Sequence, residues 1–108
     1  MPARIALMSR RAQLEKLLAA EPHDPFLRYG LAMTCVSDGD TDVACAHFQQ
    51  LLAEHPDYVA AYFQLAQLLA RQGDGDQAKP LLRSGISLAL RTGDRHAAEE
   101  MTAFLDTL

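Results

Sequence analysis

The chain has 108 residues, of which 49% are hydrophobic, 22% charged and only 6% aromatic, and its net charge at pH 7 is −4. This composition fits one small globular domain and excludes intrinsic disorder, and the acidic balance lacks the basic surface that nucleic-acid binding requires. We find neither a signal peptide nor an apolar run that spans a bilayer, so the sequence predicts a cytoplasmic protein with no nucleic-acid or membrane partner.

The first predicted helix is Ala3–Ala20, in which leucines fall on one stripe at helical spacing: Leu7, Leu14, Leu17 and Leu18. It ends before Pro22, because the residue that precedes a proline is pushed out of the α region. The next helix begins at Asp24-Pro25 and extends to about Ser37. Asp caps free backbone N–H groups, and Pro fits the first helical position.

Four more helices are predicted after turns that contain Asp, and they cover 41–54, Tyr58–Gln72, Gln77–Arg91 and Arg95–Thr107. Asp40 or Thr41 is expected to cap the first of these and Asp57 the second. The turn at 73–76 precedes the third, in which Pro80 stands close to the first turn, where a missing N–H costs little. The apolar face of the last helix consists of Ala98, Met101, Leu105 and Leu108.

The same residue types recur with a period of 34 residues. The first copy is Pro22, Leu31-Ala32, Gly39-Asp40, Ala44, Phe48 and Pro56, and the second is Pro56, Leu65-Ala66, Gly73-Asp74, Ala78 and Leu82. A fixed period of this length is typical of a stacked array of repeats, each of which is one supersecondary unit. No segment alternates β-branched and polar residues, so no strand is predicted.

This pattern resembles that of the tetratricopeptide repeat (TPR) family, which reads large–x2–Leu–small–x2–large, then Ala–x3–large, then Pro. The chain departs from it at Arg28, where an aromatic residue is usual, and in the missing final Pro of the second copy. The resemblance implies an all-α solenoid of antiparallel helical hairpins in a single domain. Its parts are an N-terminal cap helix at 1–21, repeats at 24–56 and 57–91, and a C-terminal cap helix at 94–108. Each cap helix is interpreted as the second helix of an incomplete repeat.

Small residues are expected where two helices approach closely: Ala32, Ala44, Ala66, Ala78 and Gly85. Gly85 in mid-helix costs about 1 kcal/mol of helix propensity, and close packing is the expected compensation. We predict that Gly85→Leu overpacks this contact and lowers stability by about 1–3 kcal/mol. Cys35 and Cys45 are interpreted as reduced, buried packing residues, with a disulfide between their helices as the alternative.

The sequence contains no recognisable site for chemistry. None of the four histidines pairs with another at i,i+3 or i,i+4, and the Asp-Gly-Asp turns lack the twelve-residue pattern of a calcium loop. There is also no phosphate-binding loop and no nucleophile elbow. We therefore expect a protein that is not an enzyme and that needs no cofactor and no metal.

The resemblance also implies where a ligand binds, because the first helix of each TPR hairpin lines a concave groove. The residues of this face are Phe26, Tyr29, Met33 and Ser37 in the first copy and Ala60, Phe63, Gln67 and Arg71 in the second, with Tyr58 reaching the groove from the turn. The expected function is an adaptor that binds a protein or peptide. Tyr29, Met33 and Phe63 supply apolar contact, while Gln67 and Arg71 orient the ligand. Two alternatives remain open, namely a terminal helix that covers Tyr29 and Phe63 as core and a self-associating scaffold, such as a homodimer formed through the groove or an open end.

Overall fold

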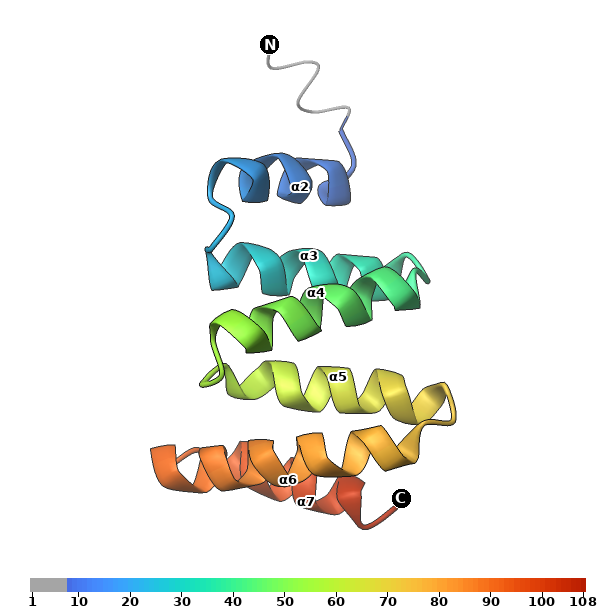
Figure 1. Ribbon diagram of the computed structural model, residues 1–108, viewed down its shortest axis with the longest axis vertical. Coiled ribbons are helices and arrows are strands. Elements are labelled where there is room, and N and C mark those ends of the chain that lie inside the picture. Colours follow the sequence, from blue (N-terminus) through green and yellow to red (C-terminus); the bar gives the residue numbers. More distant parts are fainter. Residues whose placement is uncertain (1–7) are drawn as a thin grey trace. The chain divides into compact units, whose positions relative to one another are not determined.

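The computed structural model describes residues 8–108, which form six α-helices and no strand (Figure 1). The helices are α2 (Arg10–Ala20), α3 (Pro25–Ser37), α4 (Thr41–Glu54), α5 (Val59–Arg71), α6 (Gly75–Thr92) and α7 (Arg95–Leu105). Short turns join successive helices, which therefore run antiparallel within each hairpin. The predicted all-α fold of helical hairpins is confirmed.

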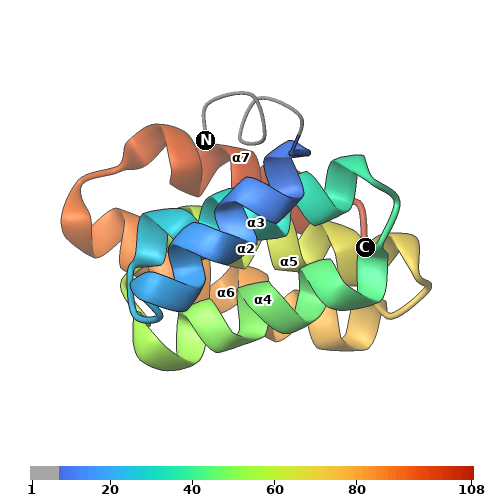
Figure 2. The ribbon, with the colours of Figure 1, turned by 90° about the horizontal axis from the view of Figure 1, so that it is seen from above.

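Contacts divide the chain into two compact units, of which the first contains the described residues up to Glu54. In this unit α3 packs against α4 on one side and α2 on the other, so that α2 lies over α3 when viewed from above (Figure 2). Leucine, alanine, cysteine and one phenylalanine fill its core: Leu14, Leu18, Leu31, Ala32, Cys35, Ala44, Cys45, Phe48 and Leu51. Both cysteines are buried and free, as their interpretation as packing residues requires.

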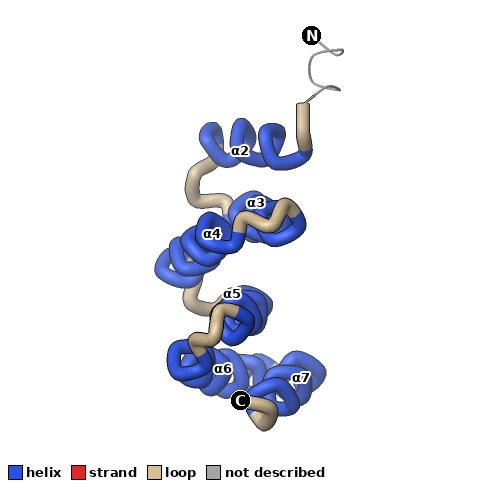
Figure 3. Tube along the Cα trace, turned by 90° about the vertical axis from the view of Figure 1, so that its right-hand side faces the viewer, coloured by secondary structure: helices blue, strands red, loops and turns tan. Residues whose placement is uncertain are grey.

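The second unit is His55–Leu108 and consists of α5, α6 and α7. Helix α5 packs along α6, and α7 packs on α6 and makes a smaller contact with α5 (Figure 3). Leucine and alanine dominate the core here as well, as the low aromatic content predicts: Ala61, Leu65, Ala66, Leu68, Leu69, Ala78, Leu82, Leu88, Ala89, Ala98 and Met101. Helix α7 follows this hairpin and contacts both of its helices.

The start of α3 confirms the prediction for Asp24 and Pro25. Asp24 Oδ1 accepts hydrogen bonds from the N–H groups of Phe26 at 2.9 Å and Leu27 at 3.2 Å. The prediction that Asp57 caps α5 was wrong, because Tyr58 occupies the N-cap position and forms no capping bond with its side chain. The N–H of Tyr58 donates instead to the carbonyl of His55 at 3.1 Å, and this extra turn delays the start of the helix.

The turns after α3 and α5 have the same geometry, because Gly39 and Gly73 adopt left-handed φ angles of 76° and 82°. In each, the N–H of the following Asp donates back across the helix end, from Asp40 to the carbonyl of Cys35 at 2.9 Å and from Asp74 to that of Leu69 at 2.8 Å. Such bonds satisfy carbonyl groups that the helix end leaves unpaired. The Gly-Asp pairs of the sequence are therefore helix stops.

Other boundaries differ from the prediction for local reasons. Helix α6 begins at Gly75 rather than near Gln77, because Asp74 Oδ1 accepts the N–H of Gln77 at 3.2 Å, and Pro80 therefore lies beyond the first turn. Helix α2 begins at Arg10, and the predicted residues 3–7, Leu7 included, lie outside the described part of the chain. Two leucines assigned to apolar faces are exposed, namely Leu17 at 52% and Leu108 at 39%, the latter beyond the end of α7.

Candidate functional site

Three of the predicted binding residues line one cleft in the second unit. Ala60, Phe63 and Gln67 lie three and four residues apart on α5 and therefore on one face of the helix. The cleft has a volume of about 460 Å³, and its other lining residues come from α5 and α7: Val59, Gln64, Ala97, Glu100 and Met101. The site is thus a trough between two helices.

The cleft is lined by both apolar and polar side chains. Phe63 contacts Phe104 of α7 edge to face, with ring centroids 5.8 Å apart and an interplanar angle of 66°. This contact leaves Phe63 half-buried, so α7 covers part of the ring and leaves part of it accessible. Glu100 Oε1 receives a hydrogen bond from His96 Nε2 at 2.8 Å, and their side chains are well exposed.

The two glutamines determine what the cleft can recognise. Gln64 and Gln67 carry amides that both donate and accept hydrogen bonds, as a peptide backbone does. Phe63, another lining residue, adds apolar contact area. A cleft of this kind suits an extended peptide segment with an apolar side chain. Among its lining residues, only the exposed Glu100 carries a charge.

Arg71 and Tyr58 stand at opposite ends of α5, and neither lines the cleft. Arg71 is exposed in the last turn of the helix, where a positive charge favours the helix dipole. Tyr58 is half-buried at the N-cap position. Of the residues predicted on α5, the structure therefore places Ala60, Phe63 and Gln67 in the cleft, whereas Tyr58 and Arg71 lie outside it.

The corresponding face of α3, in the first unit, is more open at one end. Phe26 is 76% exposed, whereas Tyr29 and Met33 are half-buried and Ser37 is exposed. Tyr29 contacts Phe48 of α4 edge to face, with centroids 5.9 Å apart. One side of Tyr29 therefore belongs to the core of this unit, and the accessible apolar surface is mainly that of Phe26 and Met33.

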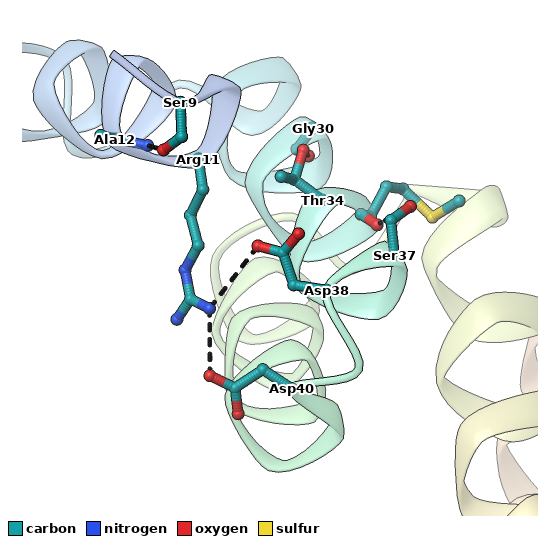
Figure 4. Close-up of polar contacts among 9 residues, drawn as sticks. Ser9, Arg11, Ala12, Gly30, Thr34, Ser37, Asp38 and Asp40 are labelled. Carbon is teal, nitrogen blue, oxygen red and sulfur yellow. Dashed lines mark hydrogen bonds and ion pairs between the residues drawn. The ribbon is translucent and has the colours of Figure 1, made fainter. Parts of the chain in front are cut away.

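Sequence reasoning missed a set of polar contacts that hold the first unit together. Arg11 of α2 pairs with Asp40 at 3.0 Å and more loosely with Asp38 at 3.8 Å, as Figure 4 shows. The hydrogen bond with Asp40 raises the pKa of Arg11 further above its ordinary value. These contacts tie α2 to the turn between α3 and α4.

Arg28, which replaces the aromatic residue of the repeat, has a polar role of its own. Its guanidinium donates to the carbonyl of Pro22 at 3.2 Å and lies 3.1 Å from His47 Nδ1. Burial and then the charge of Arg28 lower the pKa of His47 below its ordinary value, so His47 is neutral at pH 7 and accepts this hydrogen bond. The departure from the repeat is thus compensated by bonds between α3, α4 and the preceding turn.

The missed residues of the cleft are Gln64 on α5 and Ala97, Glu100 and Met101 on α7. Gln64 could have been predicted from the sequence, since it lies four residues after Ala60 on the same face of the helix. The α7 residues could not, because the last helix was interpreted as a cap. Within residues 8–108 no three His, Cys, Asp or Glu side chains are grouped to hold a metal ion, and none of the described helices meets the length and apolarity of a membrane span.

Comparison with known families gives one consistent result. Two family models, both described as tetratricopeptide repeat, match this chain, one over residues 36–98 and the other over residues 10–58. The chain is also similar to the TPR repeat-containing protein PA0015 of Pseudomonas aeruginosa. The two are 34% identical over 95 residues, which cover 88% of this chain and 90% of that protein.

Solved structures show the same similarity. A tetratricopeptide repeat domain protein from Salinibacter ruber, determined by NMR in solution, has 31% identity and a TM-score of 0.75, covering 80% of this chain and 87% of the other. Protein BPP2914 from Bordetella parapertussis has 29% identity and a TM-score of 0.80, covering 94% of this chain and 88% of the other.

Proposed function

The chain belongs to the tetratricopeptide repeat family, and we propose that it is an adaptor that binds a segment of a partner protein through the exposed face of α5, and that the exposed face of α3 is a separate contact surface. Proteins with these repeats generally mediate protein–protein interaction, and the fold typically serves as an interaction module rather than an enzyme. The observation that carries the proposal is the cleft between α5 and α7, lined by Ala60, Phe63 and Gln67.

In this proposal the partner segment lies extended along α5. Its backbone exchanges hydrogen bonds with the amides of Gln64 and Gln67, because each amide offers both a donor and an acceptor. An apolar side chain of the segment packs on the accessible part of Phe63, and Arg71 pairs with a carboxylate further along. The small side chain of Ala60 keeps the start of the cleft open, which makes this position the best place to block it.

The α3 face contributes apolar contact. Phe26 is the most exposed large apolar residue of the described chain at 76%, and Met33 adds a flexible side chain that adapts to partners of different shape. Because most of its side chain is exposed, Phe26 is a candidate anchor for a partner.

The test starts from peptides selected for binding to the wild-type chain from a random library. Ala60→Arg, which places a long charged side chain in the cleft, is expected to weaken their binding by about tenfold or more, since it removes apolar contact worth on the order of 1.4 kcal/mol. The matched control is Ala46→Arg, because Ala46 is an exposed alanine of α4 outside both proposed faces. Equal affinities of wild-type and Ala60→Arg chains for every selected peptide would refute the cleft assignment.

The α3 face is tested separately with Phe26→Ser against Leu17→Ser, since both residues are exposed and lie on different helices. Circular dichroism should show the same helix content and melting temperature for both variants. We expect weaker binding for Phe26→Ser only. If both substitutions weaken binding equally, general apolarity rather than a defined α3 face explains the interaction.

A second candidate function, self-association, is favoured by an exposed apolar surface on α6 and α7. Leu90 is 62% exposed and lines a shallow cleft of about 410 Å³ together with Ile86, Ala98 and Ala103. Large exposed apolar patches often mark interfaces. Light scattering across a concentration series tests this candidate: a dimer that Leu90→Glu converts to a monomer supports it, and a wild-type monomer at all concentrations excludes it.

A further inference from the structure

A second face of the α5–α6 hairpin carries a cleft that the proposed adaptor function does not use. Its volume is about 500 Å³, and its lining residues come from α6 and from the start of the second unit: Pro56, Tyr62, Arg83, Ser84, Ser87, Leu88 and Arg91. It shares no residue with the cleft between α5 and α7. Two arginines and two serines in one small cleft make it a candidate for binding an anionic ligand.

The two arginines and two serines of this cleft have no side-chain partners within the described residues. No ion pair there involves Arg83 or Arg91, and neither Ser84 nor Ser87 forms a side-chain hydrogen bond. All four side chains are exposed. Arg83, Ser87 and Arg91 stand at successive four-residue intervals and therefore on one face of α6. The cleft thus presents two guanidinium forks, suited to bidentate pairing with carboxylates, and two hydroxyl groups.

The cleft also contains a largely buried apolar side chain and a tyrosine whose hydroxyl is hydrogen-bonded. Leu88, which lies between the two arginines in the sequence of α6, is only 9% exposed. The hydroxyl of Tyr62 donates to the carbonyl of Pro56 at 2.6 Å, which satisfies this polar group and holds the ring in place. The cleft therefore combines two arginines with one largely buried leucine between them in the sequence of α6.

The spacing of the two arginines indicates the kind of ligand. Eight residues of α-helix separate Arg83 from Arg91 along the axis by about 12 Å, at about 1.5 Å per residue. In an extended peptide, side chains four residues apart point to the same side and lie about 13 Å apart, at about 3.3 Å per residue. The residue midway between them points to that side as well.

From this match we propose that the cleft on α6 binds an extended acidic peptide segment of a partner protein. Two carboxylates of the segment, four residues apart, pair with Arg83 and Arg91, and the apolar side chain midway between them packs on Leu88. Ser84 and Ser87 donate hydrogen bonds to the segment from α6. The adaptor then has two independent peptide sites, of which this one requires acidic residues.

The experiment uses the full chain and three blocked seven-residue peptides, followed by NMR of the backbone amides at low ionic strength. The first peptide has Glu at its second and sixth positions, Leu at the fourth and Ala elsewhere. The second replaces both Glu by Gln, and the third replaces Leu by Ser. We expect the first peptide to shift the amide signals of Tyr62 and of residues 83–91. The Gln peptide should bind at least about tenfold more weakly, because the charge-assisted bonds are lost.

The double variant Arg83→Gln/Arg91→Gln is expected to bind the first peptide about tenfold or more weakly. The control variant Arg10→Gln/Lys16→Gln loses the same net charge on α2 and should bind the peptide as the wild type does. The proposal is overturned if the Gln peptide shifts the same signals equally, or if the two double variants behave alike. A further experiment tests whether inorganic phosphate at matched ionic strength competes with the first peptide. If phosphate competes fully and the Ser peptide binds as well as the Leu peptide, the cleft is a small-anion site rather than a peptide site.

Discussion

Gly85 allows α6 to approach α5 and α7 more closely than any other residue would. A Cβ atom at this position would lie 2.8 Å from the Cβ of Tyr62 and 2.7 Å from the Sδ of Met101. Ordinary van der Waals contact of a Cβ begins at 3.4 Å, so both distances are too short. Met101 can move its flexible side chain, but the Cβ of Tyr62 is attached to the backbone of α5 and can move only with the helix.

The net effect of Gly85→Ala combines two opposite contributions. Alanine is favoured over glycine within a helix by about 1 kcal/mol. Overpacking of a well-filled contact costs about 1–3 kcal/mol, and the fixed Cβ of Tyr62 puts this site in the upper half of that range. We therefore predict a net loss of about 1–2 kcal/mol, or about 5–10 °C in melting temperature for a chain of this size. Gly85→Leu should lose at least as much.

Gly75→Ala is the matched control, because Gly75 begins the same helix and a Cβ there would meet no atom within 4 Å. Its stability should equal that of the wild type or exceed it by up to about 1 kcal/mol. Urea denaturation followed by circular dichroism measures both variants. If Gly85→Ala is as stable as Gly75→Ala, the close contact between α5, α6 and α7 is not as described.

Three further predictions concern the first unit. Burial and the Arg28 charge lower the pKa of His47 in the folded chain, so the unfolded chain binds a proton first as the pH falls. The contribution of His47 to the free energy of unfolding is therefore complete above about pH 6.5 and declines below it. In urea denaturation between pH 5 and pH 7, the free energy of unfolding of His47→Gln should fall less steeply with decreasing pH than that of the wild type. Asp24→Ala removes the cap of α3 and should cost about 1 kcal/mol in thermal melts; no loss would contradict the capping role. Arg11→Gln should lower the urea midpoint slightly by removing the pair with Asp40, and the difference from wild type should shrink at about 1 M salt; an unchanged difference would exclude an ionic origin.

Much of the fold was predictable because its signals are local. Asp24-Pro25 starts a helix through capping and proline geometry, and Gly39 stops it through a left-handed turn. Both depend on residues next to each other in sequence. The 34-residue period then distinguished buried positions such as Leu31 and Leu65 from exposed ones.

The candidate sites were only half predictable, because their other walls come from distant segments. The period identified the α5 face with Phe63, but nothing local indicated that Phe104 would contact it. The pairing of Arg28 with His47 depends likewise on the packing of α3 against α4. The arginines on α6 were visible in the sequence, yet their lack of acidic partners is a property of the folded chain.

The central claim is that the cleft between α5 and α7 receives a partner segment. NMR titration of the full chain with a peptide selected for binding tests it most directly. We expect the largest shifts for Ala60, Phe63 and Gln67 on α5 and for Ala97 and Glu100 on α7, and we expect them to disappear in Ala60→Arg. Shifts confined to other helices, or unchanged in that variant, would contradict the claim.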